Sequence, residues 1–359
     1  MDGVRHSRIA CGRLVPPWGV TAAIVFLAGC APKPTPNPGE LQRLAMRYLT
    51  AGATFRDNPV VRAQAIEALE QTEGERAAVW FREAIRDEHP GVRFAACMAL
   101  GEIRHKPSEA AIRACLNDPD PNVRVAAMFA LRRLGDPGFV REFGEIVRTH
   151  PDANVRRNAV LALGRLEEPG ALALLKKARE DKDDSVQLQA LEAMALLGDK
   201  HAIQQLIYYA NGGLGDRQAF ALGTLGRTKD PRCMDILRYS LRQATHLESR
   251  LAAARSLGLM GSDEGFALAL VSLNWNSPNP KLTDDPPANQ IMRIRTMAAF
   301  ALGAIGKPDA LEPLRQHMED PSDPRLQVAA ATAILQITRK QLAGPFEEPV
   351  PGNPPRPPK

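Results

Sequence analysis

The stretch VRFAACMALGEI, residues 92–103, returns in variants along most of this 359-residue chain. It reads VRVAAMFALRRL at 123–134, VRRNAVLALGRL at 155–166 and IRTMAAFALGAI at 294–305. The aliphatic residue that closes the alanine-rich core recurs at Leu69, Leu100, Leu131, Leu163, Met194, Leu222, Leu257, Leu302 and Ile334, at intervals of 31, 31, 32, 31, 28, 35, 45 and 32 residues. Nine copies exceed the roughly three units that such an array needs for stability.

Small and aliphatic residues keep a helical period within each unit. Measured from the closing aliphatic residue, positions −4 and −1 are each alanine in eight units of nine. These positions share one face with −8 and +3, which predicts an amphipathic helix whose small seam lets neighbours approach closely. A first helix precedes it in most units, and an acidic turn such as DPDPN at 118–122 joins the two. We therefore predict an all-α solenoid of about nine helix pairs over residues 41–340, on the order of 80 Å long if pairs stack about 10 Å apart.

The order helix, acidic turn, Val-Arg and Ala-x-x-Ala-Leu-Gly resembles the HEAT repeat, specifically the short HEAT-like repeat of bacterial proteins and phycobilisome lyases. The resemblance implies a superhelix that serves mostly as a binding scaffold. In such repeats an arginine after the turn pairs with turn aspartates as a ladder. The matching structural residues are Arg62, Arg93, Arg124, Arg156, Arg250 and Arg295. Phosphate or anion binding is the alternative role for these arginines.

The N-terminal 40 residues differ from the repeats. Three arginines precede the apolar run of residues 20–27, which is far shorter than the roughly 20 residues of a membrane-spanning helix and is typical of an export signal. The next residues, Leu27-Ala28-Gly29-Cys30, resemble the lipobox of bacterial lipoproteins. The resemblance implies that residues 1–29 are a cleaved signal peptide and that Cys30 is lipidated. Residues 30–40 then form a proline-rich tether, while an ordinary signal peptide with a chance cysteine is the alternative.

These features place the protein in the bacterial cell envelope, held by a lipid anchor. Ala31 rather than aspartate follows Cys30, which in the enterobacterial sorting pattern implies the outer rather than the inner membrane. Without residues 1–29 the chain has 43 basic and 40 acidic residues, a balance that gives no case for nucleic-acid binding. Residues 341–359 are rich in proline and are predicted to form a disordered or polyproline tail.

One column of the second helices departs from the expected pattern. It should face solvent on the concave side of the solenoid, yet several units have apolar residues there. We interpret the column as the floor of a partner-binding groove, with a contact from the insertion at 274–288: Phe94, Met98, Val125, Phe129, Leu161, Phe220, Phe300 and Trp275. Alternatively, superhelical twist turns this column against an adjacent helix.

Catalytic signatures are absent from the sequence. There is no G-x-S-x-G, no H-E-x-x-H and no phosphate-binding loop, and no histidine precedes a glutamate, which disfavours the metal motif of HEAT-repeat hydroxylases. Cys97, Cys115 and Cys233 form no C-x-x-C and are interpreted as small buried hydrophobes. We expect no metal, no cofactor and no enzymatic activity. The predicted function is a membrane-tethered scaffold that binds an envelope protein or peptide on its concave face; the alternatives are a bilin-lyase-like enzyme and a lipid-binding solenoid.

Overall fold

The computed structural model describes residues 37–168, 170–212, 215–282 and 284–342, and contains eighteen α-helices and no strand in those ranges. The first helices of the pairs are α1 (Pro38–Ala53), α3 (Ala78–Ala84), α5 (Glu109–Ala114), α7 (Val140–Thr149), α9 (Ala171–Ala178), α11 (Lys200–Gly212), α13 (Met234–Gln243), α15 (Phe266–Ser272) and α17 (Leu311–Glu319). The second helices are α2 (Pro59–Glu73), α4 (Pro90–Glu102), α6 (Pro121–Arg133), α8 (Ala153–Leu166), α10 (Asp184–Leu196), α12 (Gly215–Thr228), α14 (Leu247–Leu259), α16 (Pro287–Ile305) and α18 (Pro324–Leu342). The predicted α-solenoid is confirmed. No helix in the described ranges is long and apolar enough to cross a membrane.

The acidic turns start the second helices. Asp120 caps α6 by accepting a 2.7 Å hydrogen bond from the backbone N–H of Asn122, and Asp152 caps α8 in the same way through Asn154. Such caps satisfy N–H groups that have no partner within the helix. In these two repeats the turn sequence therefore sets where the second helix begins.

The glycine of the Ala-Leu-Gly phrase lets consecutive second helices pack closely. A Cβ atom built on Gly101 of α4 would lie 2.7 Å from the Cα atom of Ala130 in α6. On Gly303 of α16 it would lie 2.9 Å from the Cα atom of Ala333 in α18. Real Cβ atoms do not come this near to a backbone, so any larger residue would push the two helices apart.

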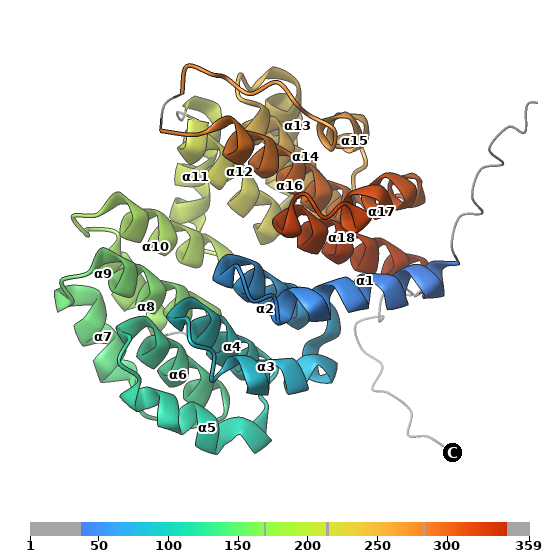
Figure 1. The fold of residues 1–359 in the computed structure, drawn as a ribbon. Coiled ribbons are helices and arrows are strands. Elements are labelled where there is room, and N and C mark those ends of the chain that lie inside the picture. Colours follow the sequence, from blue (N-terminus) through green and yellow to red (C-terminus); the bar gives the residue numbers. More distant parts are fainter. Residues whose placement is uncertain (1–36, 169, 213–214, 283, 343–359) are drawn as a thin grey trace, which may run out of the picture. The chain divides into compact units, whose positions relative to one another are not determined.

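The array closes on itself. The last helix, α18, packs against both α1 and α2, so that the blue and red ends of the repeat region lie side by side (Figure 1). Gly52 of α1 lies in this seam, where an added Cβ would meet Val328 of α18 at 3.0 Å and Ala65 of α2 at 3.1 Å. Arg339 of α18 forms an ion pair with Glu73 of α2. The second helices thus form a ring rather than the open array of about 80 Å that end-to-end stacking predicts.

Candidate functional site

Three of the expected ladder arginines join consecutive turns. The Nε and Nη2 atoms of Arg156 each donate a 2.8 Å hydrogen bond to a carboxylate oxygen of Asp181, 25 residues later. Its Nη1 atom donates to the backbone oxygens of His150 and Pro151 in the preceding turn. The same two-pronged pairing joins Arg62 to Asp87 and Arg93 to Asp118. With their donors used in this way, these arginines stiffen the stack.

The other three arginines bind backbone carbonyls in the described structure. Arg124 donates to the oxygens of Asp118 and Pro119, Arg250 to that of Leu241 and Arg295 to that of Trp275. Twenty-five residues after Arg124 stands Thr149, which offers no carboxylate. Three of the six arginines therefore form the expected ion pair with an aspartate of the next turn, and the other three contact backbone oxygens.

The apolar column is less exposed than the sequence analysis predicts. Met98, Val125 and Phe129 are buried, at 4%, 0% and 0% exposure, so they are packing residues and not the open floor expected from the sequence. These three residues instead pack against neighbouring helices, as the alternative interpretation of the column predicts. The other five are only partly accessible: Phe94, Leu161, Phe220, Phe300 and Trp275. A partner-binding role for those five remains a prediction.

Charged side chains also face the interior of the ring. Glu102 accepts hydrogen bonds from Arg133 at 3.2 Å and from Arg165 at 3.5 Å. Burial raises the pKa of Glu67, and Arg165 opposes that shift. Glu67 nonetheless keeps solvent contact, so water reaches this part of the ring.

Arg255 and Arg227 are two further cationic groups close to each other. The guanidinium group of Arg255 lies 5.3 Å from the ring centroid of Phe300, a cation–π contact, and burial together with the charge of Arg227 lowers the pKa of Arg255. The pKa of the Glu67 carboxyl group is raised, and a carboxyl group with a raised pKa can act as a proton donor. Within the described ranges, no group of three or more His, Cys, Asp or Glu residues could hold a metal ion.

The insertion after α15 is fixed to the body. Gln290 of α16 is 3% exposed and accepts a 2.9 Å hydrogen bond from the Asn279 N–H. Its amide donates to the backbone oxygens of Asn279 at 3.0 Å and Asp285 at 2.7 Å. Because α16 begins at Pro287, the last two residues of the predicted 274–288 loop are helical.

An exposed apolar row on the first helices was missed by the sequence analysis. Eight first helices carry a fully buried anchor: Phe81, Ile112, Phe143, Leu175, Leu206, Leu237, Ala269 and Leu314. The exposed position two residues later is polar or small in five of them: Glu83, Ala114, Glu145, Lys177 and Gln316. In α11, α13 and α15 it is Tyr208, Tyr239 and Val271, which are 72%, 55% and 75% exposed. We call these three residues the outer apolar row; their spacing of 31 and 32 residues was the available signal.

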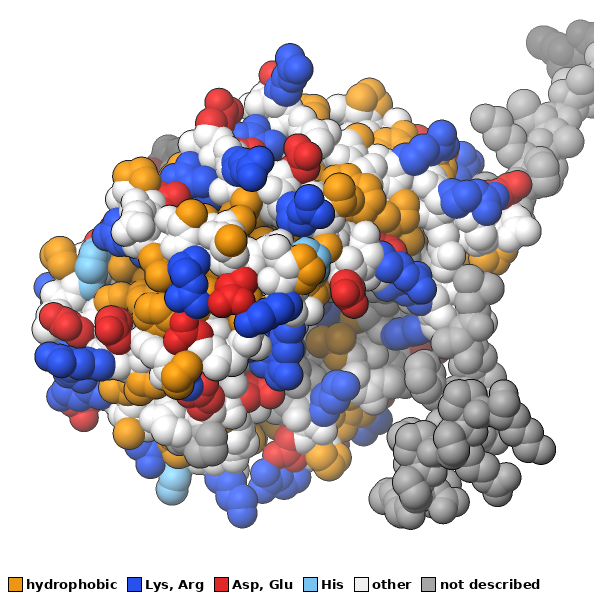
Figure 2. Space-filling view, turned by 90° about the horizontal axis from the view of Figure 1, so that it is seen from below, with side chains coloured by type: hydrophobic (Ala, Val, Ile, Leu, Met, Phe, Trp, Pro, Cys, Tyr) orange, Lys and Arg blue, Asp and Glu red, His pale blue; other side chains and the backbone are white. Residues whose placement is uncertain are grey.

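One face of the molecule shows no separation of charge. On the face drawn in Figure 2, acidic and basic side chains are interspersed, with apolar groups between them. Cys30, the preceding signal-like segment and the tail from residue 343 lie outside the described residues.

Comparison with known proteins agrees with the repeat architecture. The family of HEAT repeats matches residues 46–114, 108–195 and 140–223, and the PBS lyase HEAT-like repeat matches residues 294–320. A search of curated proteins finds no match.

Similar solved structures include several helical-repeat proteins. One is the complex of CpcE and CpcF of phycocyanin lyase from a Nostoc species, with 20% identity over 67% of this chain and 94% of that chain and a TM-score of 0.40. Another is human deoxyhypusine hydroxylase in complex with glycerol, with 19% identity over 84% of this chain and 98% of that chain and a TM-score of 0.35. A third is YIBA of E. coli, with 16% identity over 84% and 95% of the two chains and a TM-score of 0.31. The chain therefore contains HEAT repeats over residues 46–223 and a PBS lyase HEAT-like repeat at 294–320.

Proposed function

We propose that this protein is a membrane-tethered, non-catalytic interaction scaffold of the bacterial cell envelope that binds a protein or peptide through the outer apolar row. The observation that carries the proposal is the change from polar to apolar at one equivalent exposed position in three consecutive first helices. The ring interior is a poorer partner site, because three of the eight apolar residues predicted to face it are buried and the other five are only partly accessible. We therefore propose that the partner binds on the outer side and not on the concave side that the sequence analysis predicts.

The chemistry of the row suits protein recognition. Single exposed apolar residues are ordinary, but aligned ones form a patch, and tyrosine is enriched among residues that dominate binding energy. α11 and α13 pack against each other, which brings Tyr208 and Tyr239 to adjacent positions in the stack. With helices about 10 Å apart, three positions span about 20 Å, enough to seat one helix or strand of a partner.

The tether rests on the lipobox-like sequence ending at Cys30. Two or three acyl chains on its sulfur and new N-terminus would hold the protein on a membrane, because each buried methylene contributes about 0.8 kcal/mol. Intact mass spectrometry of the membrane-extracted protein tests this part. A chain that begins at residue 30 with an acyl-glyceryl mass supports the tether, and an unmodified Cys30 refutes it.

The partner site is tested by co-purification from solubilised envelopes. Tyr208→Lys, Tyr239→Lys and Val271→Lys combined should remove a specific partner and leave helical content unchanged, since all three side chains are exposed. The matched control carries substitutions at the equivalent positions of other helices, Glu83→Lys, Glu145→Lys and Gln316→Lys. Equal partner recovery by both variants would refute a role for the row.

A bilin-lyase-like enzyme is the second candidate. It is favoured by the match of residues 294–320 to the PBS lyase HEAT-like repeat and by the raised pKa of Glu67 inside the ring. Absorbance of the purified protein separates the two functions: a bound tetrapyrrole would colour the protein and support the enzyme, and a colourless preparation supports the scaffold.

A further inference from the structure

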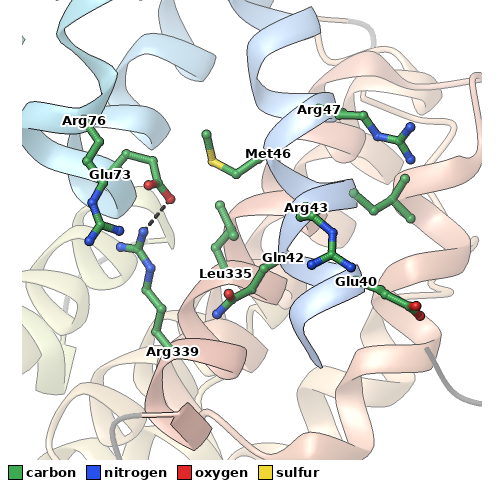
Figure 3. Close-up of a pocket in the computed structure, with 10 residues that line it drawn as sticks. Glu40, Gln42, Arg43, Met46, Arg47, Glu73, Arg76, Leu335 and Arg339 are labelled. Atoms are coloured by element: carbon green, nitrogen blue, oxygen red, sulfur yellow. Dashed lines mark hydrogen bonds and ion pairs between the residues drawn. The ribbon is translucent and has the colours of Figure 1, made fainter. Parts of the chain in front are cut away.

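A pocket lies at the seam where the ring closes (Figure 3). It has a volume of about 1040 Å³ and is bordered by α1, by the end of α2 with the short 3₁₀ turn that follows it, and by α18. We call it the seam pocket. It exists only because the first and last repeats meet, so neither end of an open array would possess it.

Arginine dominates the charged lining. Four arginines, Arg43, Arg47, Arg76 and Arg339, face two glutamates, Glu40 and Glu73. Arg339 is paired with Glu73 across the seam. In the described ranges, Arg43, Arg47 and Arg76 form no ion pair, and all three are exposed.

The arrangement of these arginines favours an anionic ligand. Arg43 and Arg47 stand one turn apart on α1, a spacing at which like charges repel each other and destabilise the helix. A phosphate or carboxylate between them would relieve that repulsion. Guanidinium groups bind such anions through two parallel hydrogen bonds.

The remaining lining is apolar. Leu44 and Met46 of α1 are half-buried, and Leu335 of α18 is 1% exposed; Met46 and Leu335 lie between the arginines of the two sides (Figure 3). A hydrated inorganic ion would leave this surface unused. A ligand with both an anionic group and a hydrocarbon portion would cover both kinds of lining.

We propose that the seam pocket binds an anionic phospholipid, with its phosphate on Arg43 and Arg47 and part of an acyl chain against Leu44, Met46 and Leu335. The choice of a lipid as the source rests on the proposed tether. α1 begins eight residues after Cys30, so an anchored chain keeps the start of α1, the helix that borders the pocket, within about 28 Å of the membrane. The binding of the headgroup and chain by the pocket does not itself require the anchor.

Native mass spectrometry of the full chain in non-ionic detergent tests the proposal. The probes are phosphatidylglycerol, phosphatidylcholine and glycerol phosphate, each added at equal concentration. We expect one bound phosphatidylglycerol per chain and at least about tenfold weaker binding of the other two probes, because phosphatidylcholine has no net negative charge and glycerol phosphate has no acyl chain. Equal binding of both lipids would overturn the role of charge, and equal binding of glycerol phosphate would overturn the role of the acyl chain.

Charge-matched variants locate the site. Arg43→Ser with Arg47→Ser should weaken phosphatidylglycerol binding about tenfold or more, while Arg82→Ser with Arg86→Ser, two exposed arginines of the second repeat outside the pocket, should leave it unchanged. If both variants bind as the unaltered protein does, the lipid is elsewhere and the proposal fails. The same spectra give the mass of the chain, which shows whether it begins at residue 30 and carries an acyl-glyceryl group. Failure of the tether and failure of the pocket are therefore recorded separately.

Discussion

Arg339 in the last helix forms an ion pair with Glu73 at the end of α2, joining residues 266 positions apart. No other ion pair in the described ranges connects residues so distant in sequence. The pair marks the interface that turns a linear stack of repeats into a ring. An open solenoid exposes its two terminal repeats, whereas here each terminal repeat covers the other.

The first prediction concerns the seam itself. Gly52→Leu places a side chain where even a Cβ atom lies 3.0 Å from Val328 and 3.1 Å from Ala65. We expect overpacking to destabilise the protein by about 1–3 kcal/mol and to open the ring. Small-angle scattering should show a larger radius of gyration. Gly223→Leu is the control, because nothing lies within 4 Å of a Cβ there, and it should leave the radius unchanged.

The second prediction concerns the ladder. Asp181→Asn removes the carboxylate that pairs with Arg156, a residue only 3% exposed, and should cost about 3 kcal/mol in the free energy of unfolding at pH 7. Asp184→Asn, at a carboxylate in an exposed ion pair with Arg217, should cost less than about 1 kcal/mol.

The effect of Asp181 has a defined pH dependence. The hydrogen bonds from Arg156 lower the pKa of Asp181, so its stabilisation is present above the unfolded-state pKa of about 3.9 and is lost as the pH falls through the lower folded-state value. Denaturant titrations should therefore show the difference between wild type and Asp181→Asn shrinking below about pH 4. A difference that persists undiminished at pH 2 would show that the ionised carboxylate is not its cause.

The third prediction concerns Glu67 in the ring interior. Because burial raises its pKa, this group favours the folded state at low pH and opposes it once the pH rises above the folded-state pKa. Glu67→Gln should therefore raise the melting temperature at pH 7 and have little effect near pH 3.5. Thermal unfolding followed by circular dichroism at both pH values checks the sign. A lower melting temperature at pH 7 would mean that the carboxylate makes a favourable interaction inside the ring.

The fourth prediction concerns two cysteines that the sequence left unrelated. The Cys97 thiol contacts Cys115, and this hydrogen bond lowers the pKa of the half-buried Cys115. Cys115 should be alkylated by iodoacetamide faster near pH 8 than the buried Cys97. Replacing Cys97 with alanine should slow alkylation of Cys115, which peptide mass spectrometry can follow. An unchanged rate would show that the contact does not stabilise the thiolate.

The repeat pattern was sufficient to predict the helix pairs, because each second helix depends on local signals such as the cap at Asp120 and the glycine at 101. Ladder pairs such as Arg156 and Asp181 also follow from a constant spacing. Ring closure could not be predicted from the repeat pattern, since it depends on small rotations accumulated over nine repeats and on contacts such as Gly52 with Val328. The apolar column was misplaced because neighbouring second helices cover it; the ring of Phe129, for example, lies against Gly101 of α4.

Photo-crosslinking in the native envelope tests the scaffold function most directly. A reactive residue in place of Tyr239, 55% exposed on α13, is compared with one in place of Glu145, the equivalent exposed position on α7. We expect one dominant crosslinked protein from position 239 and none from position 145. Equal, diffuse crosslinking from both positions, or crosslinks from neither, would contradict binding of a partner through the outer apolar row.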